Sequence, residues 1–130
     1  AINPPVNVSN FFSYIAICAV IKDERQDDLR EWVEYHHKMG IGKFYLHDNG
    51  NIPVASMFSD YMKQKIVDVK ERKDIAPQLS VYHRCIRNYR KYHRWIAFID
   101  ADEFIVTKDQ CSIPSVMKKY EGYGGLVLNW

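Results

Sequence analysis

The stretch Trp95-Ile96-Ala97-Phe98-Ile99-Asp100-Ala101-Asp102-Glu103-Phe104 is a short apolar run that ends abruptly in three carboxylates. The run has the length of a strand, and we interpret it as a buried β-strand whose C-terminal end places Asp100 and Asp102 in a crevice. Ligands bind at the C-terminal ends of the strands in open α/β sheets. The sequence therefore predicts a polar site at this end of a sheet.

Asp100 and Asp102 are candidate ligands of one divalent cation. Side chains two positions apart in an extended chain point the same way, so the two carboxylates can share an ion. Oxygen ligands suit Mg²⁺ or Mn²⁺, which usually take one or two carboxylates together with the phosphates of a substrate. The alternative is that the aspartates only cap a turn. Because the aspartates directly follow an apolar strand, and charge beside a core is costly unless it has a function, we give cation binding and turn capping equal weight.

The composition is that of an ordinary soluble globular domain. The 130 residues are 47% hydrophobic and 26% charged, enough for one domain or part of one. The net charge of +2 is too small to indicate a nucleic-acid partner. The longest apolar run, 14–21, is far shorter than the roughly 20 residues of a membrane helix, although a parent protein could still be anchored. The chain lacks an initial Met and a signal-peptide pattern, so we expect it to be trimmed or processed.

Strand-like and helix-like segments alternate after an extended lead-in at 1–13. The predicted strands are 14–21, 43–47, 66–69, 95–100 and 126–128. The predicted helices lie between them: one begins at Asp27 and ends at Gly40, one begins near Pro53, a long one runs from about Pro77 to His93, and a short one opens at 112–114. This order predicts an α/β fold with a mainly parallel sheet and helices on both faces, cut after the fifth strand.

Apolar residues at helical spacing predict the inner face of each helix. These residues are Leu29, Trp32, Val33 and His36 in the first, Val54, Met57, Phe58, Tyr61 and Met62 in the second, Leu79, Tyr82, Cys85, Ile86, Tyr89 and Tyr92 in the third, and Val116, Met117 and Tyr120 in the last. We interpret His36 as a core histidine that is hydrogen-bonded to the backbone rather than as a ligand.

The three cysteines have no metal-binding spacing. Cys18 and Cys85 fall on apolar segments and are predicted to be buried free thiols. Cys111 lies in a loop, and a bridge between Cys85 and Cys111 is the alternative. Asn7-Val8-Ser9 matches the N-glycosylation acceptor pattern, which has meaning only in a secretory compartment. The compartment stays open: Golgi or secretory lumen for a eukaryotic protein, cytoplasm for a bacterial one.

One basic cluster lies along the third predicted helix, and its members are His83, Arg84, Arg87, Arg90, Lys91, His93 and Arg94. We interpret the cluster first as a solvated outer helix face. A contribution to binding a diphosphate comes second, and a nucleic-acid surface third, because the aromatic residues of the segment face inward.

Three stretches together resemble glycosyltransferase family 92, formerly a domain of unknown function, and related family 2-like enzymes of GT-A fold. The first is Lys22-Asp23-Glu24 with 29–36 and 39–41, the second is 43–50, and the third is 95–104 with Gln78 upstream. The resemblance covers residues 14 to 107 and implies a GT-A-like, Rossmann-like fold. Residues 14–130 would be the donor-binding part, with the acceptor half absent.

The resemblance implies the site residues of a nucleotide-sugar donor. Donor contacts would come from Lys22, Asp23, Glu24, Asp48, Gln78, Asp100 and Ala101, and the metal ligands would be Asp100 and Asp102, holding Mn²⁺ or Mg²⁺. The chain departs from the commoner family pattern at Asp23, where Asn is more usual, and at 51–52. The alternative to a donor contact is, for Asp48, that it only caps the Asn49-Gly50 turn. For Gln78 the alternative is that it is simply an exposed residue in the first turn of its helix.

The function that the resemblance implies is transfer of a hexose, galactose as the first guess, from a UDP-sugar to a glycan or other hydroxyl acceptor, with inversion. The catalytic base and the acceptor half are expected beyond Trp130. Glu103 is close in sequence, but on an extended segment it would point away from its neighbours, so it is a poor candidate for the base.

Two other functions fit parts of the sequence. A degenerate donor domain could bind a nucleotide sugar without transferring it. A phosphatase of the haloacid-dehalogenase type also carries Asp-X-Asp after a strand, but there the motif comes early and needs a lysine and further aspartates well downstream. No Gly-rich phosphate-binding loop and no dinucleotide fingerprint is present, which argues against kinases, GTPases and dehydrogenases.

Overall fold

The computed structural model describes residues 13–71 and 78–128, and its centre is a parallel four-stranded sheet. The strands are β1 (Ile15–Ile21), β2 (Lys43–Asp48), β3 (Val67–Glu71) and β4 (Trp95–Phe98). They lie in the order β3-β2-β1-β4, and every neighbouring pair is parallel. The first four predicted strands and the parallel α/β class are confirmed. The predicted lead-in to residue 12, Asn7-Val8-Ser9 and Pro77 lie outside the described residues.

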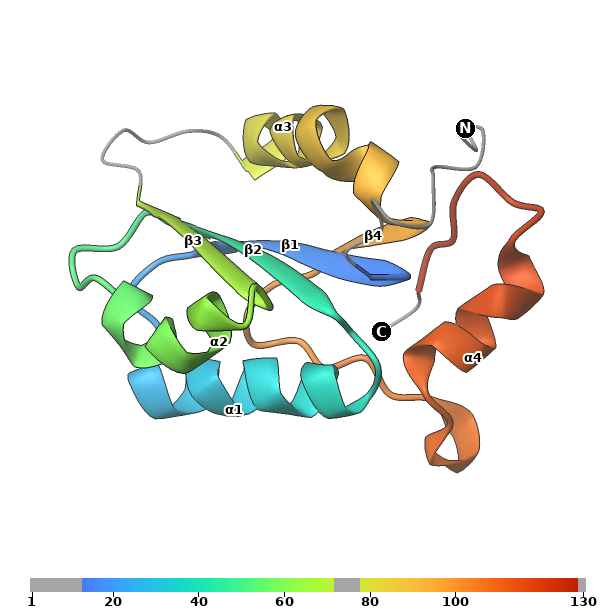
Figure 1. The fold of residues 1–130 in the computed structure, drawn as a ribbon, viewed down its shortest axis with the longest axis horizontal. Helices are drawn as coiled ribbons and strands as arrows, with labels where there is room; N and C mark the ends of the chain where they lie inside the picture. The colour runs from blue at the N-terminus through green and yellow to red at the C-terminus, as the bar shows by residue number, and fades with distance from the viewer. Residues whose placement is uncertain (1–12, 72–77, 129–130) are drawn as a thin grey trace.

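Helices cover both faces of this sheet, as the alternation of elements predicts (Figure 1). The α-helices are α1 (Gln26–Lys38), α2 (Ser59–Lys63), α3 (Gln78–Tyr89) and α4 (Ile113–Met117), and the 3₁₀ helices are η2 (Ala55–Phe58), η3 (Arg90–Tyr92), η4 (Lys108–Gln110) and η5 (Lys118–Tyr120). Helix α3 lies on one face, and α1 and α2 lie on the other. No helix of the described residues has the length and hydropathy that crossing a membrane requires.

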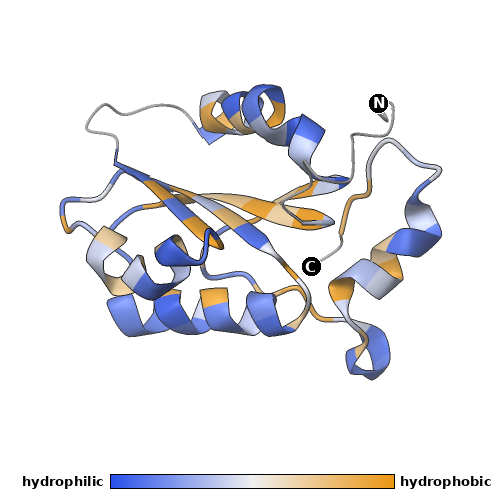
Figure 2. Ribbon diagram, in the orientation of Figure 1, coloured by the Kyte–Doolittle hydropathy of each residue, from blue (hydrophilic) through white to orange (hydrophobic). Residues whose placement is uncertain are grey.

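Strand β1 is apolar throughout because both of its faces are covered. Ile15, Ile17 and Ile21 point into the core on the α1 side, whereas Ala16 and Cys18 belong to the core on the α3 side. The alternation follows from the two-residue repeat of a strand. Figure 2 shows the resulting band of hydrophobic residues along the central strands and the mainly hydrophilic residues of α1.

Helix α1 agrees with its predicted pattern. Asp27 and Asp28 lie in its first turn, where the helix dipole favours negative charge. Its buried residues are the four predicted ones, Leu29, Trp32, Val33 and His36. The helix ends before Gly40, which has φ +104° and lies so close to Pro114 that an added Cβ would be 2.4 Å from the proline ring.

His36 is a core histidine, as predicted. Its Nδ1 donates a 2.8 Å hydrogen bond to the carbonyl oxygen of Trp32, and its Nε2 accepts one of 3.2 Å from the amide of Ile105. Burial lowers the pKa of the imidazole, so the neutral form is favoured. His36 thereby joins α1 to the segment that follows the carboxylates after β4.

The predicted fifth strand is wrong. Residues 126–128 form no strand, and Val127 is 89% exposed. A strand is stable only where a neighbouring strand supplies hydrogen-bond partners, and within residues 13–71 and 78–128 none lies beside this segment. The apolar triplet alone therefore does not determine a strand.

The predicted inner face of the third helix is partly wrong. Leu79 and Ile86 are 66% and 40% exposed, whereas Val81 and Cys85 are the residues that α3 buries. Residues four apart share a helix face, so placing 81 and 85 on the sheet turns 79 and 86 outward. The helix also ends earlier than predicted, at Tyr89, and His93 is buried rather than part of a solvated basic face.

Two smaller expectations need correction. The second helix begins at Ala55 as the 3₁₀ helix η2, and Met62 on α2 is exposed, so it is not a core residue. Within the predicted basic cluster, the solvated outer face is confirmed for four members: His83, Arg87, Arg90 and Lys91. Arg94 is half-buried and donates a 3.2 Å hydrogen bond to the carbonyl oxygen of Glu121.

The cysteine prediction is wrong in its chemistry. Cys18 and Cys85 are buried as expected, but they form a disulfide, and Cys111 is free and exposed. The alternative bridge between Cys85 and Cys111 is therefore also wrong. The pair is 67 residues apart in sequence, and it meets because the side chain of Cys18 points to the face of β1 that α3 covers.

Candidate functional site

The candidate site is the edge of the sheet at which the parallel strands end. Ile21, the last residue of β1, lies opposite Asp48, the last residue of β2. The segment Lys22-Asp23-Glu24 therefore leaves the sheet at the same edge as Asp48. Strand β4 runs parallel to β1 and leads through Ile99 to Asp100. The fold thus delivers the predicted residues to the edge where α/β sheets bind ligands.

Asp23 ties the loop after β1 to the loop after β2. Its φ is +55°, and its Oδ1 accepts hydrogen bonds of 2.7 Å from the amide of Asn51 and 3.3 Å from the amide of Ile52. Gly50 packs against it so closely that an added Cβ would be 2.6 Å from that oxygen and 2.7 Å from the Asp23 nitrogen. The two loops therefore behave as one unit, held by a carboxylate that sequence reasoning assigned to the donor.

Two other acidic groups of this edge also bind backbone. Glu24 Oε2 accepts a 2.6 Å hydrogen bond from the amide of Lys22, which folds the loop on itself. Asp48 is buried, only 3% exposed, and its Oδ1 accepts a 2.9 Å hydrogen bond from the amide of Gly50. The turn-capping interpretation of Asp48 is confirmed. Because capping uses only Oδ1, the donor contact that the resemblance implies for Asp48 stays a prediction for its other carboxylate oxygen.

The carboxylates after β4 lie on a turn, not on the extended segment that we predicted. The amide of Glu103 donates a 3.0 Å hydrogen bond to the carbonyl oxygen of Asp100, and Glu103 Oε1 accepts one of 2.8 Å from the amide of Asp100. The expectation that Glu103 points away from its neighbours is therefore wrong. Ala101 is buried beneath the turn, and Asp100 and Asp102 are exposed.

Gln78 brings helix α3 to this turn. Its Nε2 donates hydrogen bonds of 3.0 Å to Asp100 Oδ1 and 2.7 Å to the hydroxyl of Tyr82. Burial, followed by the charge of Asp100, raises the pKa of Tyr82, so the phenol stays protonated. Gln78 is thus the exposed first-turn residue of the alternative interpretation, and it contacts the Asp-X-Asp turn directly, while its contact with a donor stays a prediction.

The acids of the edge leave room for a cation but do not enclose one. Asp102 is exposed and, within the described part of the chain, its side chain accepts no hydrogen bond. In that same part, no three acidic groups come within ligand distance of one another. Two carboxylate-bearing residues on one turn fit a Mg²⁺ or Mn²⁺ ion that takes its other ligands from a diphosphate and water.

The structure does not join the two halves of the edge by side-chain contacts. Among residues 13–71 and 78–128, no hydrogen bond or ion pair connects Asp23, Glu24 or Asp48 with Asp100 or Asp102. The arrangement is therefore two separate groups, one at the ends of β1 and β2 and one at the end of β4.

Sequence reasoning missed two polar residues at this edge. Tyr82 was assigned to the core, yet its hydroxyl accepts a hydrogen bond from Gln78. Asn49 was assigned to a turn, yet its Oδ1 is buried and without a partner in the described residues. The helical spacing of 78 and 82 and the position of Asn49 directly after β2 are the signals that could have revealed them.

A shallow depression of about 570 Å³ lies elsewhere, on α3. It is lined by Leu79, Ser80, His83 and Arg87. These residues offer cations and apolar surface but no carboxylate, so the depression is unsuited to a divalent cation. We therefore place the candidate site at the strand ends.

Comparison with known proteins gives the family of this arrangement. The sequence model of glycosyltransferase family 92 matches residues 13–130, nearly the whole chain. The chain belongs to glycosyltransferase family 92. The resemblance inferred from the three sequence stretches is thereby confirmed, whereas the GT-A assignment remains a prediction.

Family 92 relatives in plants are distantly similar. Galactan beta-1,4-galactosyltransferase GALS2 of Arabidopsis thaliana is 32% identical over 107 residues, covering 73% of this chain and 20% of the relative. Galactan beta-1,4-galactosyltransferase GALS3, also of Arabidopsis thaliana, is 30% identical over 107 residues, covering 73% of this chain and 21% of the relative. A glycosyltransferase family 92 protein of Oryza sativa is 22% identical over 108 residues, covering 82% of this chain and 18% of the relative. The chain thus spans about a fifth of these relatives.

Proposed function

We propose that this family 92 chain is the donor-binding part of a glycosyltransferase, and that it binds a nucleoside diphosphate sugar across the strand ends. The observation that supports the proposal is the hydrogen bond from Gln78 to Asp100, which fixes one carboxylate of the Asp-X-Asp turn at the edge where β1 and β2 also end. The glycosyltransferase class follows from the family.

The β4 turn would bind the diphosphate. Asp100 and Asp102 would hold Mn²⁺ or Mg²⁺, which neutralises the charge that develops on the phosphate as the sugar leaves. Gln78 keeps Asp100 in place, and Glu103 closes the turn through the Asp100 amide. Since Glu103 already accepts this hydrogen bond, its task in the proposal is to hold the turn rather than to act as a base.

The β1 and β2 loops would bind the nucleoside. Asp23 holds the two loops together, and Lys22, Glu24 and Asp48 surround the same edge. Carboxylates accept hydrogen bonds from ribose hydroxyls and base N–H groups more strongly than neutral residues do. The buried Oδ1 of Asn49, without a partner in the described residues, offers one more acceptor beside Asp48.

The sugar is proposed to be galactose, and the acceptor a glycan. Two relatives are galactan beta-1,4-galactosyltransferases, and a UDP-hexose is the donor that this activity suggests. Because the sugar of UDP-galactose is α-linked, formation of a β-linkage would require inversion. Neither an acceptor site nor the general base that activates the acceptor hydroxyl is assigned to a described residue.

The experiment is calorimetric titration of the chain with UDP in the presence of Mn²⁺ and then of EDTA. We expect binding that disappears with EDTA and in Asp102→Asn, because that variant loses one metal ligand without touching the core. Asp109→Asn is the matched control, because Asp109 is an exposed acid of the 3₁₀ helix η4, and this variant should bind as the parent does. Equal UDP binding by Asp102→Asn and the parent chain would overturn the metal assignment.

A further inference from the structure

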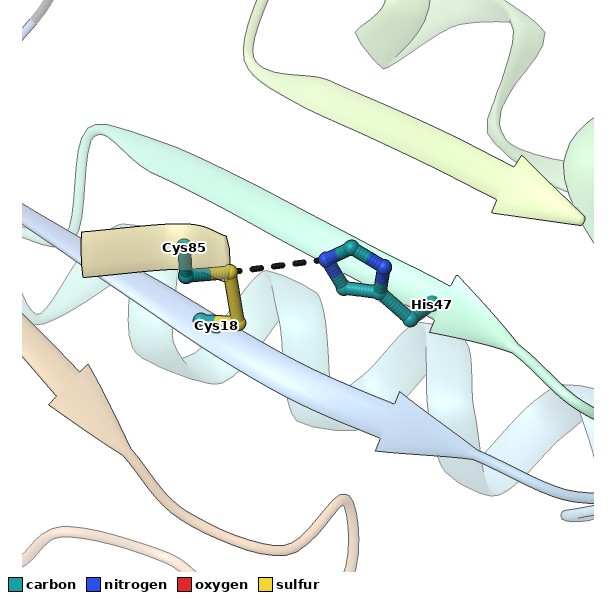
Figure 3. A group of neighbouring side chains, drawn as sticks. All are labelled: Cys18, His47 and Cys85. Atoms are coloured by element: carbon teal, nitrogen blue, oxygen red, sulfur yellow. Dashed lines mark hydrogen bonds between the residues drawn. A yellow bond between two sulfur atoms is a disulfide. The ribbon is translucent and has the colours of Figure 1, made fainter. Parts of the chain in front are cut away.

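The disulfide between Cys18 and Cys85 joins strand β1 to helix α3 in the interior of the fold (Figure 3). Both cysteines are fully buried, and the bond closes a loop of 67 residues. Each cysteine lies within a regular element rather than in a loop, so the bond fixes the position of the helix on the sheet.

His47 of β2 lies beside this bond, with its Nε2 3.4 Å from Cys85 Sγ (Figure 3). A disulfide sulfur carries no hydrogen, so the imidazole nitrogen is the donor of this contact. The ligand atoms of Cys18, His47 and Cys85 lie within 4.8 Å of one another, as in a soft-metal site. Such a site needs thiolates, so a bound metal and the disulfide are mutually exclusive.

Helix α3 buries fewer of its residues against the sheet than α1 does. It buries only Val81 and Cys85, whereas α1 buries four residues, and its Leu79 and Ile86 are exposed. At its C-terminal end the ring of Tyr89 stacks on that of Tyr45, with centroids 3.8 Å apart. The N-terminal half of the helix is therefore held by Val81, by the ring of Tyr82, whose centroid lies 4.5 Å from that of Phe98 in β4, and by the disulfide.

This N-terminal half carries the contact to the candidate donor site. Gln78, the first residue of α3, is seven positions before Cys85, which is about two helical turns or roughly 10 Å along the axis. A helix held at Cys85 keeps Gln78 at a fixed distance from β1, and therefore from the turn that follows β4. A helix that pivots about Tyr89 would move Gln78 away from Asp100.

We propose that the Cys18–Cys85 disulfide is the covalent anchor that positions the first turn of α3, and with it Gln78, against Asp100. In forming the bond, the two thiols lose two protons and two electrons to an exchanging disulfide, which is reduced to two thiols. The role of Gln78 in binding rests on the proposed donor function, whereas the anchoring of α3 does not. Because cytosolic reductants keep most thiols reduced, the domain is expected to mature in an oxidising compartment.

The first test asks whether the bond exists in the isolated protein. Peptide mapping without reductant should recover one peptide that joins Cys18 to Cys85, while Cys111 reacts with an alkylating reagent. Two free thiols at 18 and 85, or a stoichiometric zinc or copper ion released by acid, would overturn the proposal.

The second test measures the anchoring. Hydrogen exchange of residues 79–84 should become at least tenfold faster in Cys18→Ala/Cys85→Ala, while residues 29–36 of α1 keep the parent rates. Cys111→Ser is the matched control and should change neither segment. Should the double variant fail to fold, the folded parent is treated with a water-soluble trialkylphosphine, which is oxidised to its oxide as the disulfide is reduced. Unchanged exchange in α3 after loss of the bond would overturn the anchor.

The third test separates the anchor from the donor function. We expect the affinity for UDP with Mn²⁺ to fall at least threefold when the disulfide is lost. Loosening of α3 with full UDP affinity would overturn the positioning role of the disulfide. Failure of the parent chain itself to bind UDP would overturn the positioning role and count against the proposed donor function, while faster exchange in α3 would still establish the anchor.

Discussion

Gln78 Nε2 donates a 3.0 Å hydrogen bond to Asp100 Oδ1, and this contact joins the first residue of α3 to the turn after β4. The two residues are 22 positions apart in sequence. Their contact couples the helix on one face of the sheet to the edge at which the strands end. A displacement of the first turn of α3 would therefore break this contact with one carboxylate of the Asp-X-Asp segment.

Replacement of Gln78 by alanine should weaken donor binding without unfolding the domain. A hydrogen bond to a charged group contributes about 1 kcal/mol at an exposed position, so the affinity for UDP with Mn²⁺ should fall about fivefold. Calorimetric titration at fixed Mn²⁺ measures the change. Gln26→Ala is the matched control, because Gln26 is the exposed first residue of α1. An equal affinity in the two variants would remove Gln78 from the site.

Reduction of the disulfide should lower the stability of the domain. In the chain-entropy account, a closed loop of 67 residues contributes about 4 kcal/mol, and measured values for disulfides cluster between about 2 and 4 kcal/mol. Urea unfolding of the parent and of Cys18→Ala/Cys85→Ala gives the difference in the free energy of unfolding. Cys111→Ser should unfold as the parent does, because Cys111 is exposed and free.

Gly50→Ala should destabilise the unit formed by the loops after β1 and β2. The new methyl group would lie 2.6 Å from Asp23 Oδ1 and 2.7 Å from the Asp23 nitrogen, and this backbone atom cannot swing aside. Crowding of this kind costs about 1–3 kcal/mol of unfolding free energy. The control is Gly125→Ala, since an added Cβ there meets no atom within 4 Å. Equal midpoints of urea unfolding for the two variants would show that the loops can separate freely.

The sequence predicts α1 better than α3 for a physical reason. The apolar residues of α1 form one stripe, so the spacing of Leu29, Trp32 and Val33 leaves a single inner face. The apolar residues of α3 lie on more than one side of the helix, and the side on which the sheet lies decides which of them are buried. The position of the sheet relative to the helix depends on the pairing of strands that are distant in sequence, and a local sequence pattern does not predict that pairing.

The site was predictable in its residues but not in its geometry. The alternation of apolar strands and polar loops places Asp48 and Asp100 at strand ends, because all strands of a parallel sheet end at one edge. The turn at Asp100 was missed because β4 ends at Phe98, earlier than the apolar run suggests. The Cys18–Cys85 pairing was missed because 67 residues separate the partners and only the strand order brings them together.

His93 should make the stability of the domain depend on pH. Its Nε2 accepts a 2.7 Å hydrogen bond from the hydroxyl of Tyr45, and its Nδ1 donates one of 3.0 Å to the carbonyl oxygen of Ser13. Burial first, and then the charge of Lys43, lower the pKa of His93 to about 4. In the unfolded chain the pKa returns to about 6.5, so between these values the unfolded state binds more protons than the folded state.

The contribution of His93 to the free energy of unfolding should therefore be fully present above pH 6.5. It should decrease as the pH falls toward 4, by about 3 kcal/mol in total. Burial also lowers the pKa of His36, so the parent chain should lose more than the share of His93 alone. Urea unfolding at pH 7.5 and pH 4.5 measures both. His93→Gln should show a smaller loss than the parent, and His83→Gln, which alters an exposed histidine of α3, should match the parent. If His93→Gln and the parent lost the same free energy, the imidazole would have to be charged in the folded protein.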